Sequence, residues 1–291
     1  MSSPAITVIV PGRDVAAFAG EALRSLQTQT LDSWRAVLVD DGSTDDTRRL
    51  FADAAAADPR FVLVEHDEPR GLGAARNSGL DLVDTPYTAF LDADDRLRPH
   101  ALERLRQTLE TTGSDFVVGA YVRLRPDADG PGCTAGDVQP WVAAATDPAR
   151  EGTTLAQHPA ASGNIVAWSK LSRTDFWHAH ALRFPEGRYY EDQVVAQRMY
   201  TLATAFDVVP DVVIEWRERR DRSSITQRLS EVDLLRAPHP QPRPPAAGAD
   251  RRNASGPGIP DRARGVPRDA AGVADARHPA GVHDTPHRVQ R

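Results

Sequence analysis

The chain has 291 residues, 40% hydrophobic and 26% charged, which is enough for a sizeable core in one large or two ordinary domains. Its net charge of −6 argues against a general nucleic-acid binder, and its single cysteine, Cys133, excludes an internal disulfide. The first ten residues lack the basic region of a signal peptide and no stretch approaches the ~20 apolar residues of a membrane span, so we expect a cytoplasmic protein, while peripheral contact with a membrane stays open.

Strands and helices alternate between residues 5 and 95. Runs of β-branched and apolar residues predict the strands, and apolar residues at helical spacing predict the helices between them. The predicted strands are residues 5–10, 36–39, 61–65 and 87–91, with Pro11 and Gly12 breaking the first, and the predicted helices are 15–29, 45–57 and 71–83. This alternation predicts an α/β fold with a mostly parallel sheet flanked by helices.

The pattern is weaker beyond residue 95. It predicts helices at residues 99–112, 141–145 and 193–202, strands at 116–120, 121–124, 206–209 and 212–216, and a polar loop at 126–136. Residues 165–176 are apolar again without a clear period.

The composition changes abruptly near Arg236. Residues 237–291 contain ten prolines and nine arginines but no Leu, Phe, Tyr, Trp, Met, Lys or Glu. Such a segment cannot bury enough apolar surface to offset its loss of chain entropy, so we expect a disordered tail. The break falls inside a promising helix, which leaves two interpretations: a change of reading frame that replaces the native C-terminal part, or a genuine Pro/Arg-rich tail.

Unusual polar residues follow each of the four predicted N-terminal strands, at residues 11–14, 40–43, 66–76 and 92–95. Ligands bind beyond the carboxyl ends of parallel strands, so four clusters at one edge predict a ligand site. The last cluster places three carboxylates within four positions, and carboxylate oxygens are the ligands that Mg²⁺ and Mn²⁺ prefer. The alternative is a solvated acidic turn that caps the next helix.

Two common nucleotide-binding motifs are absent. Residues 71–76 begin like a dinucleotide-binding G-x-G-x-x-G, but Arg76 replaces the third glycine and the segment follows the third strand instead of the first. No G-x-x-x-x-G-K-[ST] phosphate-binding loop occurs.

Taken together, the chain resembles the GT-A-fold glycosyltransferases of family 2. The matching pieces are TVIVP at 7–11, SLQTQT at 25–30, VDDGSTD at 39–45, the segment 71–79 with its ARN, FLDADD at 90–95, WSKL at 168–171 and YED at 190–192. The resemblance covers about residues 5–230 and implies a GT-A type sheet with a smaller C-terminal acceptor-side region. We therefore expect residues 1–125 to bind the nucleotide sugar, 126–236 to form the acceptor-side half of the same domain, and 237–291 to form the tail.

The resemblance implies a nucleotide-sugar donor, a UDP-sugar by default, and Mn²⁺ or Mg²⁺ as the metal. Pro11 and Asp41 would lie against the base, with Asp41 accepting a hydrogen bond from its N–H. Arg13 stands where the family often has an aromatic residue, and its guanidinium plane can stack on the base as well. Asp14 replaces the usual Asn.

The resemblance also implies the residues that hold the diphosphate. Asp92 and Asp94 form the family's DxD motif, with Asp94 as the direct metal ligand and Asp92 as its partner. Arg76 would steady this region, although it could simply pair with one of the two aspartates. Arg217 and Ser224 lie in a basic segment that closes over the diphosphate in the family, and the alternative there is a solvated charge run.

Asp192 matches the family's general base, which takes the proton of the acceptor hydroxyl as it attacks the anomeric carbon. Attack opposite the leaving group implies inversion. The alternative for Asp192 is an acidic residue that favours the start of a helix. Lys170, the only lysine, could donate to acceptor or phosphate, or it could pack its stem and leave its head in solvent.

The implied activity is metal-dependent, inverting transfer of a sugar to a hydroxyl of a glycan, polyol-phosphate or lipid-linked acceptor in cell-wall or surface polysaccharide synthesis. A nucleotidyltransferase is a second hypothesis, since it also uses paired carboxylates near a strand end, but no Gly-rich loop with Lys or Arg follows the first strand. A third hypothesis is a truncated remnant that binds the nucleotide without turnover.

Overall fold

The computed structural model describes residues 3–128, 130 and 132–220. The predictions for the tail at 237–291 and for Ser224 lie outside these residues, and the division of the chain at 125/126 stays a prediction. Within the described part of the chain, no helix combines the length and the hydropathy that crossing a membrane requires.

Strands and helices alternate through the N-terminal half, as the apolar runs predict. The strands are β1 (Ile6–Gly12), β2 (Trp34–Asp40), β3 (Phe61–Glu65) and β4 (Tyr87–Phe90), and the helices between them are α1 (Ala16–Gln27), α2 (Thr47–Ala57) and α3 (Leu72–Leu80). The prediction that Pro11 and Gly12 break the first strand is wrong. β1 continues through Pro11 to Gly12 because both residues stay in register with β2, beside Val39 and Asp40.

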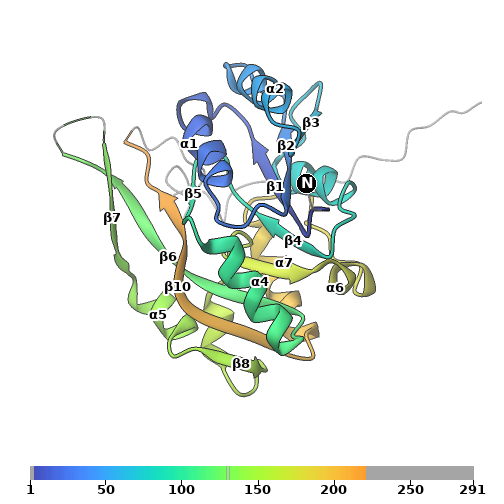
Figure 1. Ribbon diagram of the computed structural model, residues 1–291, viewed down its shortest axis with the longest axis vertical. Coiled ribbons are helices and arrows are strands. Elements are labelled where there is room, and N and C mark those ends of the chain that lie inside the picture. Colours follow the sequence, from blue (N-terminus) through green and yellow to red (C-terminus); the bar gives the residue numbers. More distant parts are fainter. Residues whose placement is uncertain (1–2, 129, 131, 221–291) are drawn as a thin grey trace, which may run out of the picture. The chain divides into compact units, whose positions relative to one another are not determined.

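These four strands form a parallel half-sheet in the order β3-β2-β1-β4 (Figure 1). Parallel pairing gives all four strands the same direction, so their carboxyl ends meet at one edge. Helix α3 packs on β1 and β2. It lies so close to β1 that a Cβ added at Gly79 would stand 2.4 Å from Cγ2 of Ile9.

The C-terminal half extends the same sheet in the order β9-β6-β10-β5, next to β4. Its elements are β5 (Arg96–Leu97), α4 (Ala101–Thr112), β6 (Phe116–Pro126), β7 (Cys133–Val138), α5 (Pro140–Thr146), β8 (Arg150–Thr153), η1 (Pro159–Gly163), β9 (Lys170–Arg173), α6 (Thr174–Ala179), α7 (Glu191–Leu202) and β10 (Phe206–Arg217). β9 is antiparallel to both β4 and β6, whereas β6 and β10 are parallel. The fold is therefore of the α/β class, with a mixed parallel and antiparallel sheet flanked by helices.

Several predictions for this half are wrong in detail. The two strands predicted on either side of residue 120 are one strand, β6, and the two predicted around Pro210 are one strand, β10. β10 passes Pro210 through an irregularity in its pairing with β6 between Val209 and Val212, which is where a sheet tolerates a residue that cannot donate. The loop predicted at 126–136 contains the start of β7, a strand of partly and fully exposed residues that pairs with β6.

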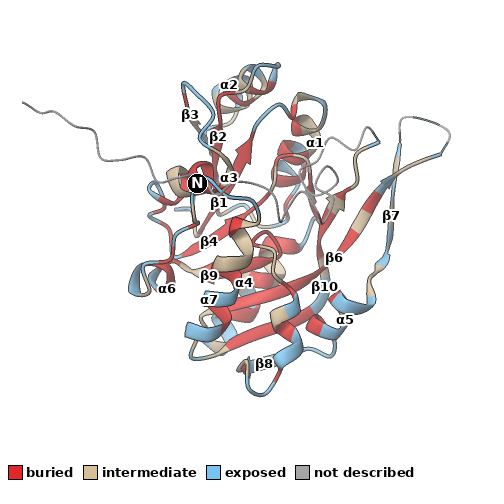
Figure 2. Ribbon diagram, turned by 180° about the vertical axis from the view of Figure 1, so that it is seen from behind, coloured by how far each residue is buried: buried red, intermediate tan, exposed pale blue. Residues whose placement is uncertain are grey.

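The buried face of the sheet carries the core (Figure 2). Phe116 of β6 stacks on Phe206 of β10 with ring centroids 5.2 Å apart. Phe90 at the end of β4 contacts Trp177 of α6 and Phe184, with centroids 5.4 and 5.1 Å away. Aromatic contacts of this kind add to the stabilisation that burial provides. They anchor the strand ends and the segment before α7, where the polar clusters lie.

Candidate active site

The carboxyl ends of β1, β2 and β4 place three predicted clusters at one edge of the sheet (Figure 1). These clusters are residues 11–14, 40–43 and 92–95. The fourth cluster begins beside them, because the residue after β3 donates its N–H to the carbonyl of Asp40, at 2.9 Å. The predicted convergence of four strand-end clusters is confirmed.

Asp41 is buried just beyond β2 and its carboxylate accepts three hydrogen bonds. Oδ1 takes the N–H of Arg70 at 2.8 Å and pairs with Nδ1 of His66 at 2.7 Å, while Oδ2 takes the N–H of Gly71 at 2.8 Å. Nε2 of His66 in turn lies 2.9 Å from the hydroxyl of Ser78 on α3. Asp41 is therefore held rigidly by a loop and a histidine before any ligand arrives.

The loop after β1 carries the other residues predicted at the base. Pro11 is buried within β1, whereas Arg13 and Asp14 are exposed. Asp14 has a φ of 52°, the left-handed region that Asn and Asp tolerate best among residues with a side chain. Its Oδ1 accepts from the backbone N–H of Thr44 at 2.8 Å, so it ties the loops after β1 and β2 together.

Three aspartates follow β4 and two of them meet arginines from the end of β10. Asp94 Oδ2 accepts from Nη2 and Nε of Arg219 at 2.6 and 3.0 Å. Asp95 is buried: its Oδ1 accepts from the N–H of Arg217 at 2.7 Å, and its Oδ2 has no hydrogen-bond partner among the described residues. Burial raises the pKa of Asp94 against the opposing charge of Arg219, and burial together with the charges of Asp94 and Asp92 raises that of Asp95 further.

Arg76 is the charged centre of the site, with only 1% of its surface exposed. It projects from α3, where its Nη2 donates to Oδ1 of Asp92 at 2.7 Å and its Nη1 donates to Oε1 of Glu191, the first residue of α7. Its guanidinium also lies 5.2 Å from the centre of the Phe184 ring. Arg76 therefore pairs with Asp92 and joins the DxD segment to helix α7, and its role beside the diphosphate stays a prediction.

Asp192 occupies the first turn of α7, directly after Glu191. Tyr190 precedes the helix with a φ of 55°, a left-handed turn that starts the helix at this point. Oδ1 of Asp192 accepts from the N–H of Gln193 at 3.0 Å. Burial raises the pKa of Asp192 despite the opposing charge of Arg76, and the charge of Asp92 adds to the rise. A carboxylate with a raised pKa is a stronger base near neutral pH.

Arg217 is buried and all its contacts are internal. Its Nε donates to the carbonyl of Asp94 at 2.8 Å and its Nη2 donates to Glu21 of α1 at 2.7 Å. The guanidinium groups of Arg217 and Arg219 lie 5.3 and 4.9 Å from the centre of the Phe18 ring on the same helix. The end of β10 is thus fixed against α1 and the DxD turn.

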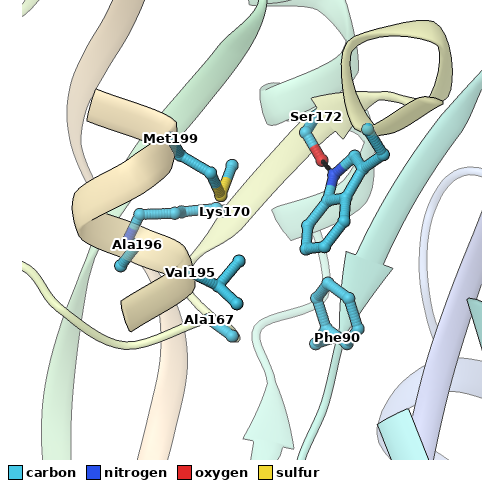
Figure 3. A pocket seen from close by; sticks show the side chains of 8 residues that line it. Phe90, Ala167, Lys170, Ser172, Val195, Ala196 and Met199 are labelled. Carbon is cyan, nitrogen blue, oxygen red and sulfur yellow. Dashed lines mark hydrogen bonds between the residues drawn. The ribbon is translucent and has the colours of Figure 1, made fainter. Parts of the chain in front are cut away.

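Lys170 has its ammonium group inside the protein, so the predicted solvated head is wrong. Its Nζ donates to the carbonyl and side-chain oxygens of Asn164, at 2.8 and 3.0 Å, and to the carbonyl of Val166 at 2.6 Å. Burial lowers the pKa of Lys170 to about 7, and the charge of Asp192 opposes this change. These three acceptors hold the ammonium, and the stem lines a cavity of about 10 Å³ between β9 and α7 (Figure 3). This cavity holds at most about one water molecule and is no substrate site.

Sequence reasoning missed the partners that orient the predicted residues. The sequence places Glu191 beside Asp192, His66 in a strand-end cluster and Arg219 in a charge run, and it does not indicate their contacts. Within residues 3–128 and 132–220, no three His, Cys, Asp or Glu side chains are grouped so that they could hold a metal ion by themselves. A metal at the DxD turn would therefore need ligands from the substrate as well.

Comparison with known proteins gives a consistent result. Residues 7–129 match the family model described as glycosyl transferase family 2. The EpsH protein of Bacillus subtilis is 30% identical over 238 residues, which cover 79% of this chain and 65% of EpsH. The chain thus spans slightly less than two thirds of that relative.

Two solved structures share the fold. S. aureus TarS 1–349 in complex with UDP-GlcNAc has a TM-score of 0.65 and 21% identity, over 79% of this chain and 63% of that one. The mannosyltransferase PcManGT of Pyrobaculum calidifontis, in complex with GDP-Man and Mn²⁺, has a TM-score of 0.55 and 21% identity, over 75% of this chain and 57% of that one. At this level of identity the likeness concerns the fold alone.

Proposed function

Since residues 7–129 match the model of glycosyl transferase family 2, we propose that the chain transfers a sugar from a nucleotide sugar to an acceptor hydroxyl with inversion. The observation that carries this proposal is the bridge through Arg76. One buried guanidinium joins Asp92, in the turn proposed to hold the diphosphate, to Glu191, the neighbour of the proposed base Asp192. The two halves of a displacement reaction, leaving group and base, are thereby held in one rigid unit.

The donor would bind along the sheet edge. Asp41 would accept the N–H of the base in the corner formed by Pro11 and Arg13, and a UDP-sugar is the default donor. Two observations support this placement: the carboxylate of Asp41 is held in one orientation by three donors, and the loops after β1 and β2 are tied together. A pre-formed corner reduces the entropy lost on binding.

The DxD turn suits a divalent cation in the type of its donors. Asp92 and Asp94 each use one carboxylate oxygen for an arginine, which leaves the second oxygen for a cation. When bound there, Mn²⁺ or Mg²⁺ would neutralise charge on the departing diphosphate. Arg217 is fixed by its contacts with the carbonyl of Asp94 and with Glu21. Arg219 contacts the carboxylate of Asp94, so it is the arginine that would move when a cation binds there.

Asp192 would take the proton of the acceptor hydroxyl while that oxygen attacks the anomeric carbon from the side opposite the diphosphate. This geometry inverts the anomeric configuration. The raised pKa of Asp192 supports the role, because a stronger base removes the hydroxyl proton more readily. A glycan, a polyol phosphate or a lipid-linked sugar would each present such a hydroxyl.

The test is release of UDP from a panel of UDP-sugars with Mn²⁺, repeated with Asp94→Asn and Asp192→Asn. We expect both variants to lose transfer, with Asp192→Asn still binding UDP in calorimetry. Full activity in both variants would end the assignment. Release of pyrophosphate from a nucleoside triphosphate and a sugar phosphate would favour a nucleotidyltransferase, and UDP binding with no turnover would favour a non-catalytic binder.

A further inference from the structure

The hydrogen bonds to the carboxylate of Asp41 are distributed unevenly between its two oxygens. An ionised carboxylate has about four lone-pair positions, two on each oxygen. Oδ1 lies in contact with two donors, the N–H of Arg70 and Nδ1 of His66, whereas Oδ2 accepts from the N–H of Gly71. Three positions are thus occupied by described residues, and the fourth belongs to Oδ2. Asp41 is 4% exposed, which suits one further hydrogen bond better than a broad contact.

His66 supplies the one donor to Asp41 that comes from a side chain. Nδ1 lies 2.7 Å from Oδ1, and we assign the proton to Nδ1 because an ionised carboxylate has none to donate. Nε2 lies 2.9 Å from the hydroxyl of Ser78, and the main-chain N–H of His66 donates to the carbonyl of Asp40 at 2.9 Å. With both ring nitrogens engaged inside the protein, the imidazole does not turn away from Asp41 when a ligand binds.

The loop after β3 closes one approach to this corner and leaves another open. A Cβ added at Gly42 would stand 2.7 Å from the main-chain nitrogen of Pro69, so the loop packs directly on Gly42. A Cβ added at Gly71 would meet no described atom within 4 Å. A base therefore approaches from the side of Gly71, whose N–H binds Oδ2.

We propose that His66, by filling Oδ1 of Asp41, makes the corner select a base with a single N–H on its Watson–Crick edge, uracil instead of guanine. The inference rests on the proposed function, since it takes Asp41 as the residue that accepts from the base. The N3–H of uracil lies between two carbonyls and needs one acceptor, which Oδ2 supplies.

Guanine presents two neighbouring donors, N1–H and the 2-amino group. When N1–H donates to Oδ2, the 2-amino group faces Oδ1, where Arg70 and His66 already occupy both positions. A buried donor without an acceptor weakens binding, so the corner rejects guanine through a group that does not itself touch the base.

The experiment separates this effect from the size of the base by comparing two purine nucleotides. Inosine diphosphate and guanosine diphosphate share one ring system, and only guanosine diphosphate carries the 2-amino group. Binding of both, and of UDP, is measured by calorimetry in the presence of Mn²⁺. We expect the wild type to bind inosine diphosphate about tenfold more tightly than guanosine diphosphate, and UDP more tightly than either.

Two substitutions distinguish the two ring nitrogens of His66. His66→Asn keeps a donor near the position of Nδ1 and should keep the ratio of the two purine affinities. His66→Gln keeps an amide near the position of Nε2 but loses the donor to Oδ1, so the two purine nucleotides should bind within about twofold of each other. The matched control is His158→Gln, at a buried histidine before η1 whose Nε2 lies 2.9 Å from the carbonyl of Ala145, and it should leave the ratio unchanged.

The proposal is overturned if the wild type binds guanosine diphosphate as tightly as inosine diphosphate, a result that needs no variant. It is also overturned if folded His66→Gln keeps the wild-type ratio. Binding of UDP with neither purine nucleotide bound at millimolar concentration overturns it as well, because base size would then exclude guanine without His66. A protein that binds none of the three nucleotides would instead refute the proposed function.

Discussion

Removal of Arg76 should destabilise the protein far more than removal of an exposed arginine with similar partners. Arg76→Met keeps the aliphatic stem but leaves Asp92 and Glu191 without the charge that both contact inside the protein. Breaking a buried ion pair by removing one partner costs about 3–5 kcal/mol, because the remaining charge loses its hydration without compensation. For a domain of this size that corresponds to a decrease in Tm of roughly 10 °C.

The matched control is Arg49→Met on α2. Arg49 pairs with Asp46 and Asp53 at 3.2 and 3.3 Å, but its side chain is 61% exposed. Water solvates all three groups when the contact is lost, so the urea midpoint should stay unchanged within error. Each variant leaves two carboxylates without their arginine, and the two sites differ in how deeply these groups are buried.

The assay is urea unfolding followed by tryptophan fluorescence, with the midpoint compared at an unchanged m-value. The triple variant Arg76→Met, Asp92→Asn, Glu191→Gln removes every charge of the bridge and should recover most of the lost stability. A loss below about 1 kcal/mol for Arg76→Met alone would refute the reasoning. So would a triple variant that is no more stable than the single one.

Gly79→Ala should lower the free energy of unfolding, measured in urea, by about 1–3 kcal/mol because α3 has no room for a methyl group against β1. The control Gly20→Ala, whose added Cβ would stand 3.5 Å from its nearest neighbour, should raise it by roughly 1 kcal/mol. Equal effects of the two substitutions would contradict this reasoning. Because the pKa of Asp192 is raised, its carboxylate becomes protonated as pH falls through a value above the usual ~4. The midpoint of the acid-side decline of kcat should therefore lie above pH ~4, and a midpoint at or below pH ~4 would argue against Asp192 as the base. Arg219→Gln removes the arginine that contacts Asp94, so Mn²⁺ binding measured by calorimetry in the presence of UDP should tighten about tenfold, and unchanged affinity would show that the arginine does not compete with the metal.

The parallel half of the sheet could be predicted because each strand is a short apolar run that ends in polar residues. Four such runs, with helical spacing between them, leave few topologies open. β9 could not be found in this way. Lys170–Arg173 has no apolar run, and these four residues are a strand only because they fit between β4 and β6, which are distant in sequence.

The positions of the candidate site residues followed from strand ends and from the resemblance, but their contacts did not. The sequence left Arg76 with two interpretations, since nothing in it says that α7 begins beside α3. The burial of Lys170 depends on Asn164 and Val166, whose carbonyls face inward only in the folded chain. Propensity and spacing describe local structure, whereas the contact between Arg76 and Glu191 joins residues 115 positions apart.

The corner around Asp41 has a consequence for how freely its loop can change in sequence. Two of the three donors to the carboxylate are main-chain N–H groups, those of Arg70 and Gly71, so these two hydrogen bonds do not depend on the side chains at positions 70 and 71. Position 70 accepts any residue that keeps an N–H, which excludes only proline. Gly71 is different: its φ of 92° suits glycine, although a Cβ there would meet open space. The path of the loop therefore depends mainly on the backbone at Gly71 and on the buried carboxylate of Asp41.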